Sequence, residues 1–277
     1  MIKRAVSIPL FLSLFLLFTA CGSGSTEITV LSREEGSGTR SAFTELSGIL
    51  SEGRDLTYPR AEVNASTAVM IQTVIYNPSA IGYISLGSLR GSVKALPLDG
   101  VYPSVESIRD GSYPLARDFL LGVREPLSPL AADFLRFLQS DCARQIIEGS
   151  GYTALGGGDY PRLLQTGTLR LAGSSSVAPV MEKLVEEYRR LQPHITVELQ
   201  TSDSSTGLSA LSSGLCDIAM SSRALTENEK SAGIRAVPLC KDGIAVIVSP
   251  DNPITGLSMA QLRAIFTGAV RNWDELP

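Results

Sequence analysis

The segment SREEGSGTR, residues 32–40, places a glycine- and hydroxyl-rich turn between a predicted strand and a predicted helix. Residues 28–31 form the short apolar run of a buried strand, and apolar side chains recur at helical spacing over 41–50. The start of such a helix offers free backbone N–H groups and the positive end of the helix dipole. With two hydroxyls and the guanidinium of Arg33 nearby, these donors predict an oxyanion site. An ordinary capped helix after a surface turn is the alternative for this segment alone.

Three more hydroxyl-rich turns follow predicted strands: GSSSVAP (173–179), TSDSSTG (201–207) and MSSR (220–223). In open α/β sheets, ligands bind at the carboxyl ends of strands, where helices begin. Each turn alone is also explained by the preference of serine for turns and helix N-caps. Together the four turns predict a compact tetrahedral oxyanion held mostly by neutral dipoles, with one strong cation in the first turn and one in the fourth.

Strand-like and helix-like segments alternate along the chain, which predicts an α/β architecture with largely parallel sheets. We expect strands at 80–86, 93–98, 168–173, 195–199, 217–220 and 243–248, and helices at 66–76, 128–147, 177–191 and 257–266. Residues 154–167, with three consecutive glycines and a proline, are typical of a linker or surface loop.

The N-terminus has the pattern of a secretory signal peptide over residues 1–20, with a basic start, a short apolar core and small residues at its end. Cys21 follows LFTA as in the lipobox of bacterial lipoproteins, so we expect it to be lipidated. Residues 22–26 are a predicted flexible tether. No second long apolar segment follows, so the protein is expected outside the cytoplasm, at the membrane surface (cell surface or periplasm), and to touch the membrane only through its lipid.

Composition excludes several other classes of function. The net charge is −4, with both signs mixed along the chain and no basic block, so no nucleic-acid partner is expected. After processing, the remaining cysteines are Cys142, Cys216 and Cys240, without a CxxC pair, which is a poor framework for metal or disulfides. We therefore predict no metal and no cofactor.

Catalysis is the rival class, because the serine-rich turns could supply a nucleophile. The single histidine, His194, lies in a polar turn before a predicted strand, which disfavours a Ser-His-Asp triad. Lys183 lies inside a predicted helix and Lys241 has no motif around it, so neither is a placed base. The sequence therefore predicts a binding protein and no enzyme.

As a set, the turns and their flanking segments resemble the phosphate-binding proteins of bacterial ABC transporters, which have the type II periplasmic-binding-protein fold. The matching segments are SREEGSGTR, NPSAIGYISLGSL, GSSSVAPVMEKLVEEY, SSTGLSAL, CDIAMSSRALTENEK, KDGIAVIVSPDNP, LSMAQLRAIFTG and NWDEL. The resemblance implies a two-lobed, Venus-flytrap molecule that closes over its ligand. It extends over nearly the whole mature chain.

The order of these segments differs from that of the family, where the segment like GSSSVAP comes first and NWDEL leads into the segment like SREEGSGTR. This order indicates a circular permutation, and a fusion of gene fragments is the alternative. One lobe is then expected to be continuous, residues 93–239 with the linker inside it. The other is expected to be split between 27–92 and 240–277. Whether the chain is a monomer or completes this lobe by swapping with a second copy stays open.

The resemblance also implies a set of phosphate ligands. They are Arg33, Ser37, Gly38, Thr39, Ser175, Ser176, Ser204 and Ser222. Ser222 stands where many members have an aspartate that accepts the proton of hydrogen phosphate, so selectivity against sulfate is expected to be weaker. Glu35 is expected to orient Arg33.

The function implied is that of an extracytoplasmic lipoprotein that captures inorganic phosphate and delivers it to the membrane permease subunits of an ABC transporter. A sensing or adhesion lipoprotein without a transport role is one alternative. Binding of another tetrahedral oxyanion, such as sulfate, is the other.

Overall fold

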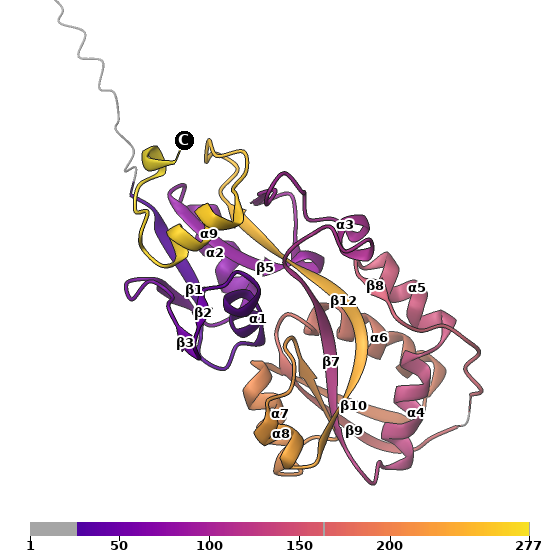
Figure 1. Ribbon diagram of the computed structural model, residues 1–277. Coiled ribbons are helices and arrows are strands. Elements are labelled where there is room, and N and C mark those ends of the chain that lie inside the picture. Colours follow the sequence, from indigo (N-terminus) through magenta and orange to yellow (C-terminus); the bar gives the residue numbers. More distant parts are fainter. Residues whose placement is uncertain (1–26, 163, 277) are drawn as a thin grey trace, which may run out of the picture.

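The computed structural model describes residues 27–162 and 164–276; the predicted signal peptide, Cys21 and the tether lie outside this part. Figure 1 shows two lobes joined by two long strands that run from one lobe into the other. The described N-terminal and C-terminal segments lie in the same lobe. We call this the first lobe and the other the second lobe.

The first lobe contains β1 (Thr29–Arg33), α1 (Gly38–Leu46), β2 (Leu50–Ser51), β3 (Arg54–Asp55), β4 (Glu62–Asn64), α2 (Thr67–Tyr76), β5 (Ala80–Ser85), β6 (Lys94–Ala95), α3 (Val105–Arg109) and α9 (Met259–Phe266). The second lobe contains α4 (Pro129–Leu138), α5 (Asp141–Gly149), β8 (Thr153–Ala154), β9 (Gly167–Ser174), α6 (Ala178–Leu191), β10 (Ile195–Ser202), α7 (Ser204–Ser212), β11 (Ile218–Ser221) and α8 (Glu227–Ser231). The crossing strands are β7 (Ala116–Arg124) and β12 (Ile234–Val248).

The main sheet runs through both lobes in the order β10-β9-β11-β7-β12-β5-β1-β4. Strands β10, β9 and β11 are parallel, as are β5, β1 and β4. The crossing strands are antiparallel to each other and to their neighbours β11 and β5. The expectation of largely parallel sheets is therefore wrong for the middle of the sheet, because β7 leads into the second lobe and β12 returns from it.

The boundary between the lobes also differs from the expected one. Residues 93–115 belong to the expected continuous lobe, but Leu96, Leu98 and Leu115 are buried in the core of the first lobe, with Ile28 of the N-terminal segment. Because a hydrophobic side chain packs where apolar surface is available, the core contacts place this segment in the first lobe. The core of the second lobe begins within β7 and ends at Cys240 in β12.

The predicted helix over 128–147 is two helices, α4 and α5. The break occurs at Gln139–Ser140, where the Ser140 side chain caps α5 by accepting a hydrogen bond from the backbone N–H of Ala143. The apolar stripe continues across the break, so the spacing of apolar residues alone did not reveal it.

The predicted linker over 154–167 is tied to the second lobe. The Tyr160 hydroxyl donates to the carboxylate of Asp133 on α4 at 2.6 Å, and Tyr188 of α6 donates to the same oxygen at 2.8 Å. Burial, together with the hydrogen bond to Asp133, raises the pKa of Tyr160 to about 12. The backbone N–H of Asp141 also donates to the carbonyl oxygen of Gly158 at 2.8 Å, so the loop is attached to the second lobe at more than one point.

Candidate anion-binding site

Four helices begin around one volume between the lobes: α1 and α2 of the first lobe, and α6 and α7 of the second. Three of them have capped N-termini. The Ser37 side chain accepts from the N–H of Arg40, Ser66 from that of Val69, and Asp203 from that of Thr206. Because each N-terminus carries partial positive charge, the four together favour an anion.

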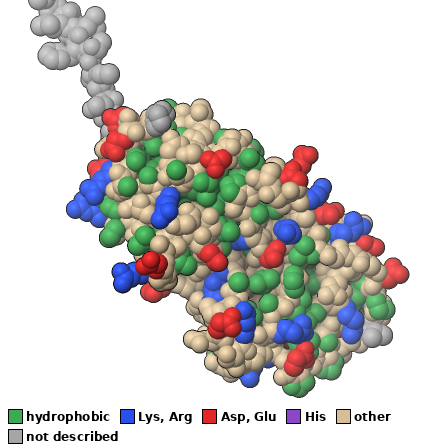
Figure 2. Space-filling model, in the orientation of Figure 1, with side chains coloured by type: hydrophobic (Ala, Val, Ile, Leu, Met, Phe, Trp, Pro, Cys, Tyr) green, Lys and Arg blue, Asp and Glu red, His purple; other side chains and the backbone are tan. Residues whose placement is uncertain are grey.

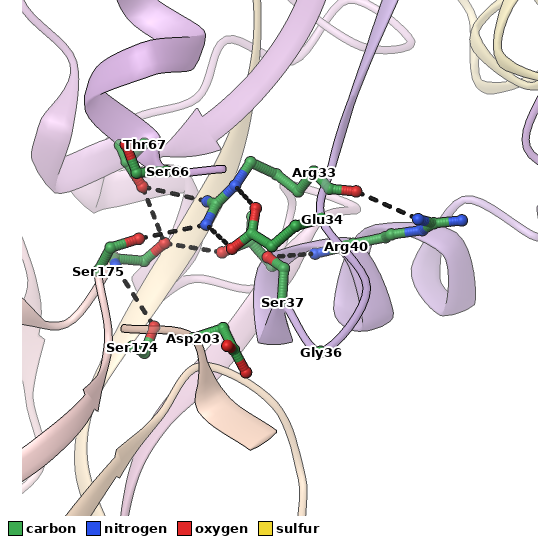
Figure 3. Close-up of polar contacts among 12 residues, drawn as sticks. Arg33, Glu34, Gly36, Ser37, Arg40, Ser66, Thr67, Ser174, Ser175 and Asp203 are labelled. Carbon is green, nitrogen blue, oxygen red and sulfur yellow. Dashed lines mark hydrogen bonds and ion pairs between the residues drawn. The ribbon is translucent and has the colours of Figure 1, made fainter. Parts of the chain in front are cut away.

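Arg33 is the cation of this site. It ends β1 and is only 1% exposed. Its guanidinium donates to both carboxylate oxygens of Glu34, at 2.7 and 2.6 Å. It also donates to the hydroxyl of Thr67 in its own lobe at 3.3 Å and to that of Ser175 in the second lobe at 3.2 Å (Figure 3). Arg33 therefore lies at the junction of the two lobes.

Hydroxyl groups from both lobes surround Arg33 and bond to one another. We call the following residues the hydroxyl cage: Arg33, Thr39, Thr67, Ser174, Ser175, Ser176, Ser204 and Ser222. The Oγ1 of Thr39 lies 2.7 Å from the Oγ of Ser176, and the Oγ1 of Thr67 lies 3.2 Å from the same Ser176 atom. Every one of these side chains except that of Ser175 is buried.

Ser222, the residue that directly follows β11, hydrogen-bonds to the remaining hydroxyls. Its Oγ is 3.0 Å from that of Ser174, 3.4 Å from that of Ser204 and 3.5 Å from that of Thr39. A hydroxyl can both donate and accept, so this group can rearrange its protons around a bound oxyanion. The cage can thus offer many neutral donors and one charged one.

The two lobes touch closely at α1. The N–H and the hydroxyl of Ser205 donate to the carbonyl oxygen of Gly36 at 3.3 and 3.2 Å. Gly36 has a φ of +88°, which favours glycine. A Cβ atom added to Gly38 would lie 2.3 Å from the Oγ of Ser204 and 2.7 Å from that of Ser222, so only glycine fits there.

Most of the residues expected to bind the anion come together here. Six supply side chains to the cage: Arg33, Thr39, Ser175, Ser176, Ser204 and Ser222. Gly38 has no side chain and so lets the start of α1 lie close to Ser204 and Ser222. Ser37 differs, because its hydroxyl caps α1 and its N–H donates to the carbonyl oxygen of Glu34.

Two further expectations about charged groups need correction. Glu35 is exposed, and the carboxylate that orients Arg33 is that of Glu34. The second cation, Arg223, donates to both carboxylate oxygens of Glu229 and to the hydroxyl of Ser205, so its contacts lie beside the cage. Among the residues described in the cage, Arg33 is thus the one cation.

Sequence reasoning missed Thr67 and Ser174. Ser174 ends β9, within a segment that was expected to bind. Thr67 follows strand β4 and the cap Ser66 at the start of α2, the same succession of strand, hydroxyl turn and helix as in the other turns. That pattern in NAST (64–67) was the available signal.

A buried ion pair lies next to the cage, on the crossing strands. Arg117 of β7 donates through Nε and Nη2 to one oxygen of Asp242 of β12, at 3.0 and 2.9 Å, and through Nη1 to the carbonyl oxygen of Ser222 at 3.1 Å. Ser85 donates to the other oxygen of Asp242. Burial raises the pKa of Asp242 and lowers that of Arg117, and the opposite charge of each partner counteracts this. The pair links the crossing strands to a cage residue.

Asp242→Asn is expected to lower the free energy of unfolding by about 3–5 kcal/mol, because it leaves the buried Arg117 without its counter-charge. Urea unfolding followed by circular dichroism measures this change. Asp118→Asn, an exposed carboxylate next to Arg117, is the matched control. A loss no larger than that of the control would contradict the role assigned to the pair.

No three His, Cys, Asp or Glu side chains come together as metal ligands within 27–162 and 164–276. In the same ranges, no helix is both long and apolar enough to cross a bilayer. Figure 2 shows acidic and basic side chains mixed over the visible face. The cage itself offers hydroxyl groups and one guanidinium, which suit the capture of an anion by hydrogen bonds.

The sequence matches the PBP superfamily domain over residues 20–142 and 161–277. It is 43% identical over 261 residues to "Phosphate-binding protein PstS 2" of Streptococcus agalactiae, an alignment that covers 92% of this chain and 89% of the relative. The chain belongs to the PstS family of phosphate-binding proteins. "Phosphate-binding protein PstS 2" of Streptococcus pneumoniae is 41% identical with the same coverage.

The crystal structure of a phosphate-binding protein of a phosphate ABC transporter from Streptococcus pneumoniae is similar in fold. The TM-score is 0.73 at 39% identity, covering 91% of this chain and 100% of that one. The expected type II periplasmic-binding fold is therefore confirmed. These relatives are named as binding proteins, which agrees at the level of the family with the prediction of a non-enzyme.

Other PstS proteins match only part of the chain. The phosphate-binding protein PstS of Pseudomonas aeruginosa is 35% identical over 126 residues, which is 40% of this chain and 39% of that protein. That of Bacillus subtilis is 34% identical over 116 residues, with similar coverage.

Proposed function

We propose that this protein binds inorganic phosphate between its lobes and delivers it to the membrane permease subunits of an ABC transporter. The observation that carries the proposal is the hydroxyl cage, in which a buried arginine and seven hydroxyls from both lobes meet at four helix N-termini. Such a site holds a compact tetrahedral oxyanion by charge-assisted and neutral hydrogen bonds. The names of the relatives support phosphate as that anion.

Titration calorimetry of the purified protein with inorganic phosphate tests binding. Phosphate uptake by cells that lack the gene, with and without a plasmid copy, tests delivery. Saturable binding and restored uptake are expected. Binding without any effect on uptake would favour the sensing or adhesion alternative.

We further propose that the protein acts outside the cytoplasm, anchored through a lipid on Cys21. The support is the signal-like N-terminus and the position of the cysteine directly after it. A Cys21→Ala chain that stays in the membrane fraction would contradict the anchor.

The chain order is best explained by a circular permutation. The described chain ends are adjacent, since the N–H of Ile28 donates to the carbonyl oxygen of Arg271 at 2.7 Å and Glu27 pairs with Asn272. Such proximity is what joining and reopening a chain requires. A permuted order also accounts for the partial matches to some PstS proteins. The near-complete matches to the streptococcal relatives argue against a chance fusion of gene fragments.

Linking 276 to 27 and reopening the chain in the loop of 154–167 should give a folded protein that binds phosphate.

Sulfate is the second candidate ligand, because Ser222 in the cage is a hydroxyl where a carboxylate would repel a fully ionised anion. We expect the protein to bind sulfate at millimolar concentration, more weakly than phosphate. Ser222→Asp is expected to weaken sulfate binding by at least about tenfold, ~1.4 kcal/mol, while phosphate still binds. Calorimetry with both anions measures the ratio.

Ser112→Asp, at an exposed serine, controls for the added negative charge. Sulfate giving no heat at millimolar concentration with the unsubstituted protein would show that Ser222 does not relax selectivity.

A further inference from the structure

Ser222 contributes a hydroxyl to the cage from a backbone position beyond the end of its strand. The last residue of β11 is Ser221, and the pairing of β11 with β7 ends at Ser221 and Leu120. Two side chains hold the backbone of Ser222 instead. Its N–H donates to the Oγ of Ser204 at 3.1 Å, and its carbonyl oxygen accepts from Nη1 of Arg117 at 3.1 Å. Because a buried carbonyl needs a donor, the placement of this cage residue depends on Arg117.

Arg117 is itself fixed in one orientation. Its guanidinium donates through Nε and Nη2 to the same oxygen of Asp242, which leaves Nη1 directed at the carbonyl oxygen of Ser222. The guanidinium carbon also lies 5.0 Å from the centre of the Phe119 ring. A guanidinium presents its donors in a rigid, planar fork. The contact with Asp242 therefore sets the direction of the hydrogen bond to Ser222.

The pair of Arg117 and Asp242 lies on the two strands that join the lobes, where the residues stand opposite each other in register (Figure 1). Four apolar residues flank the pair along the chain and mark where each core ends: Leu115 and Ile244 for the first lobe, Phe119 and Cys240 for the second. A rotation of one lobe relative to the other has to bend the crossing strands between these two cores. The ion pair thus lies at the expected hinge.

Asp242 is also bonded to the first lobe. Its other oxygen accepts from the hydroxyl of Ser85, the last residue of β5, at 2.8 Å. The backbone N–H of Gly87 is a further donor to this carboxylate. Ser85 is 0% exposed, Asp242 1% and Arg117 8%, so little water can compete for these bonds. A buried chain of hydrogen bonds therefore runs from the first lobe through both crossing strands to Ser222.

We propose that Arg117 is a positioning residue for phosphate binding, which holds the Ser222 hydroxyl at the anion by way of the Ser222 backbone. Asp242, bonded to Ser85, fixes the orientation of Arg117 relative to the first lobe. The position of the Ser222 hydroxyl therefore depends on the angle between the lobes, and this donor reaches the anion only in the closed arrangement. The inference rests on the proposed phosphate site.

Arg117→Lys keeps the positive charge beside Asp242 but loses the fork that also reaches Ser222. Titration calorimetry with inorganic phosphate should show a loss of affinity of at least about fivefold. In a Ser222→Ala background, which retains Arg33 and the other hydroxyls, the same substitution should cost less than about twofold. A residue that acts through Ser222 gives such non-additive losses, whereas a purely structural role gives equal losses in both backgrounds.

Arg235→Lys is the matched control, because Arg235 is an exposed arginine of β12 paired with Glu125, and it should leave the affinity unchanged in both backgrounds. Thermal unfolding without phosphate shows whether Arg117→Lys is folded. If it is not, Ser85→Ala decides, since it should weaken binding severalfold only where Ser222 is present. Equal losses in both backgrounds, or no loss at all, would overturn the positioning role and leave the proposed function standing. If inorganic phosphate does not bind to the unsubstituted protein, the proposed function fails instead.

Discussion

Arg33→Ala is expected to weaken phosphate binding by roughly a hundredfold or more, about 3 kcal/mol. The substitution removes the one cation of the described cage. It also leaves Glu34, which is paired to Arg33 through both carboxylate oxygens, as an uncompensated negative charge beside the incoming anion. The loss should therefore exceed that of a single neutral hydrogen bond, which is about 1 kcal/mol.

Titration calorimetry measures this effect, and thermal unfolding without ligand shows whether the variant is folded. Arg170→Ala is the matched control, because Arg170 is an exposed arginine of β9 paired with Glu198. A change below about tenfold, ~1.4 kcal/mol, would mean that Arg33 does not contact the ligand.

Gly38→Ala is expected to weaken phosphate binding by about ten- to a hundredfold, the effect of about 1–3 kcal/mol of overpacking. The added methyl group would lie within 2.7 Å of two hydroxyl oxygens of the opposite lobe, those of Ser204 and Ser222. To relieve this clash, the closed lobes would have to move slightly apart, or the two hydroxyls would have to turn away. The first lobe alone should tolerate alanine at the first residue of α1.

The test is specific because Gly38→Ala should affect phosphate binding without affecting the stability of the unliganded protein. Thermal unfolding without phosphate should change little, while the rise in melting temperature caused by phosphate should shrink. Gly91→Ala is the control, since a Cβ there meets nothing within 4 Å. An undiminished stabilisation by phosphate would rule out a steric role for Gly38.

The local structure of the site was predictable because it depends on neighbouring residues. A short apolar run, a cap such as Ser66 or Ser258 and an apolar stripe define each strand–turn–helix unit. The hydroxyls follow from the positions of the turns. That the turns meet at one place was expected from their shared position at the carboxyl ends of strands and from the family resemblance, and the structure brings them together.

The missed features depend on contacts between distant residues. Strand β7 has the charged Arg117 and Asp118 near its start, so the apolar pattern that predicts a buried strand is interrupted there. Arg117 is paired with Asp242, which lies far along the chain. The choice of Glu34 over Glu35 as the partner of Arg33 depends on how β1 turns into α1. The sequence alone does not distinguish the two carboxylates as partners of Arg33.

The unequal division of the cage between the lobes bears on the order in which a bound phosphate would be unloaded. If the lobes separate, Ser175, Ser176, Ser204 and Ser222 leave together, because all of them belong to the second lobe. Arg33, Thr39 and Thr67 remain with the first lobe. We expect the anion to lose most of its neutral donors first, so a permease that pulls on the second lobe would receive an ion still held by Arg33 and the two hydroxyls of the first lobe.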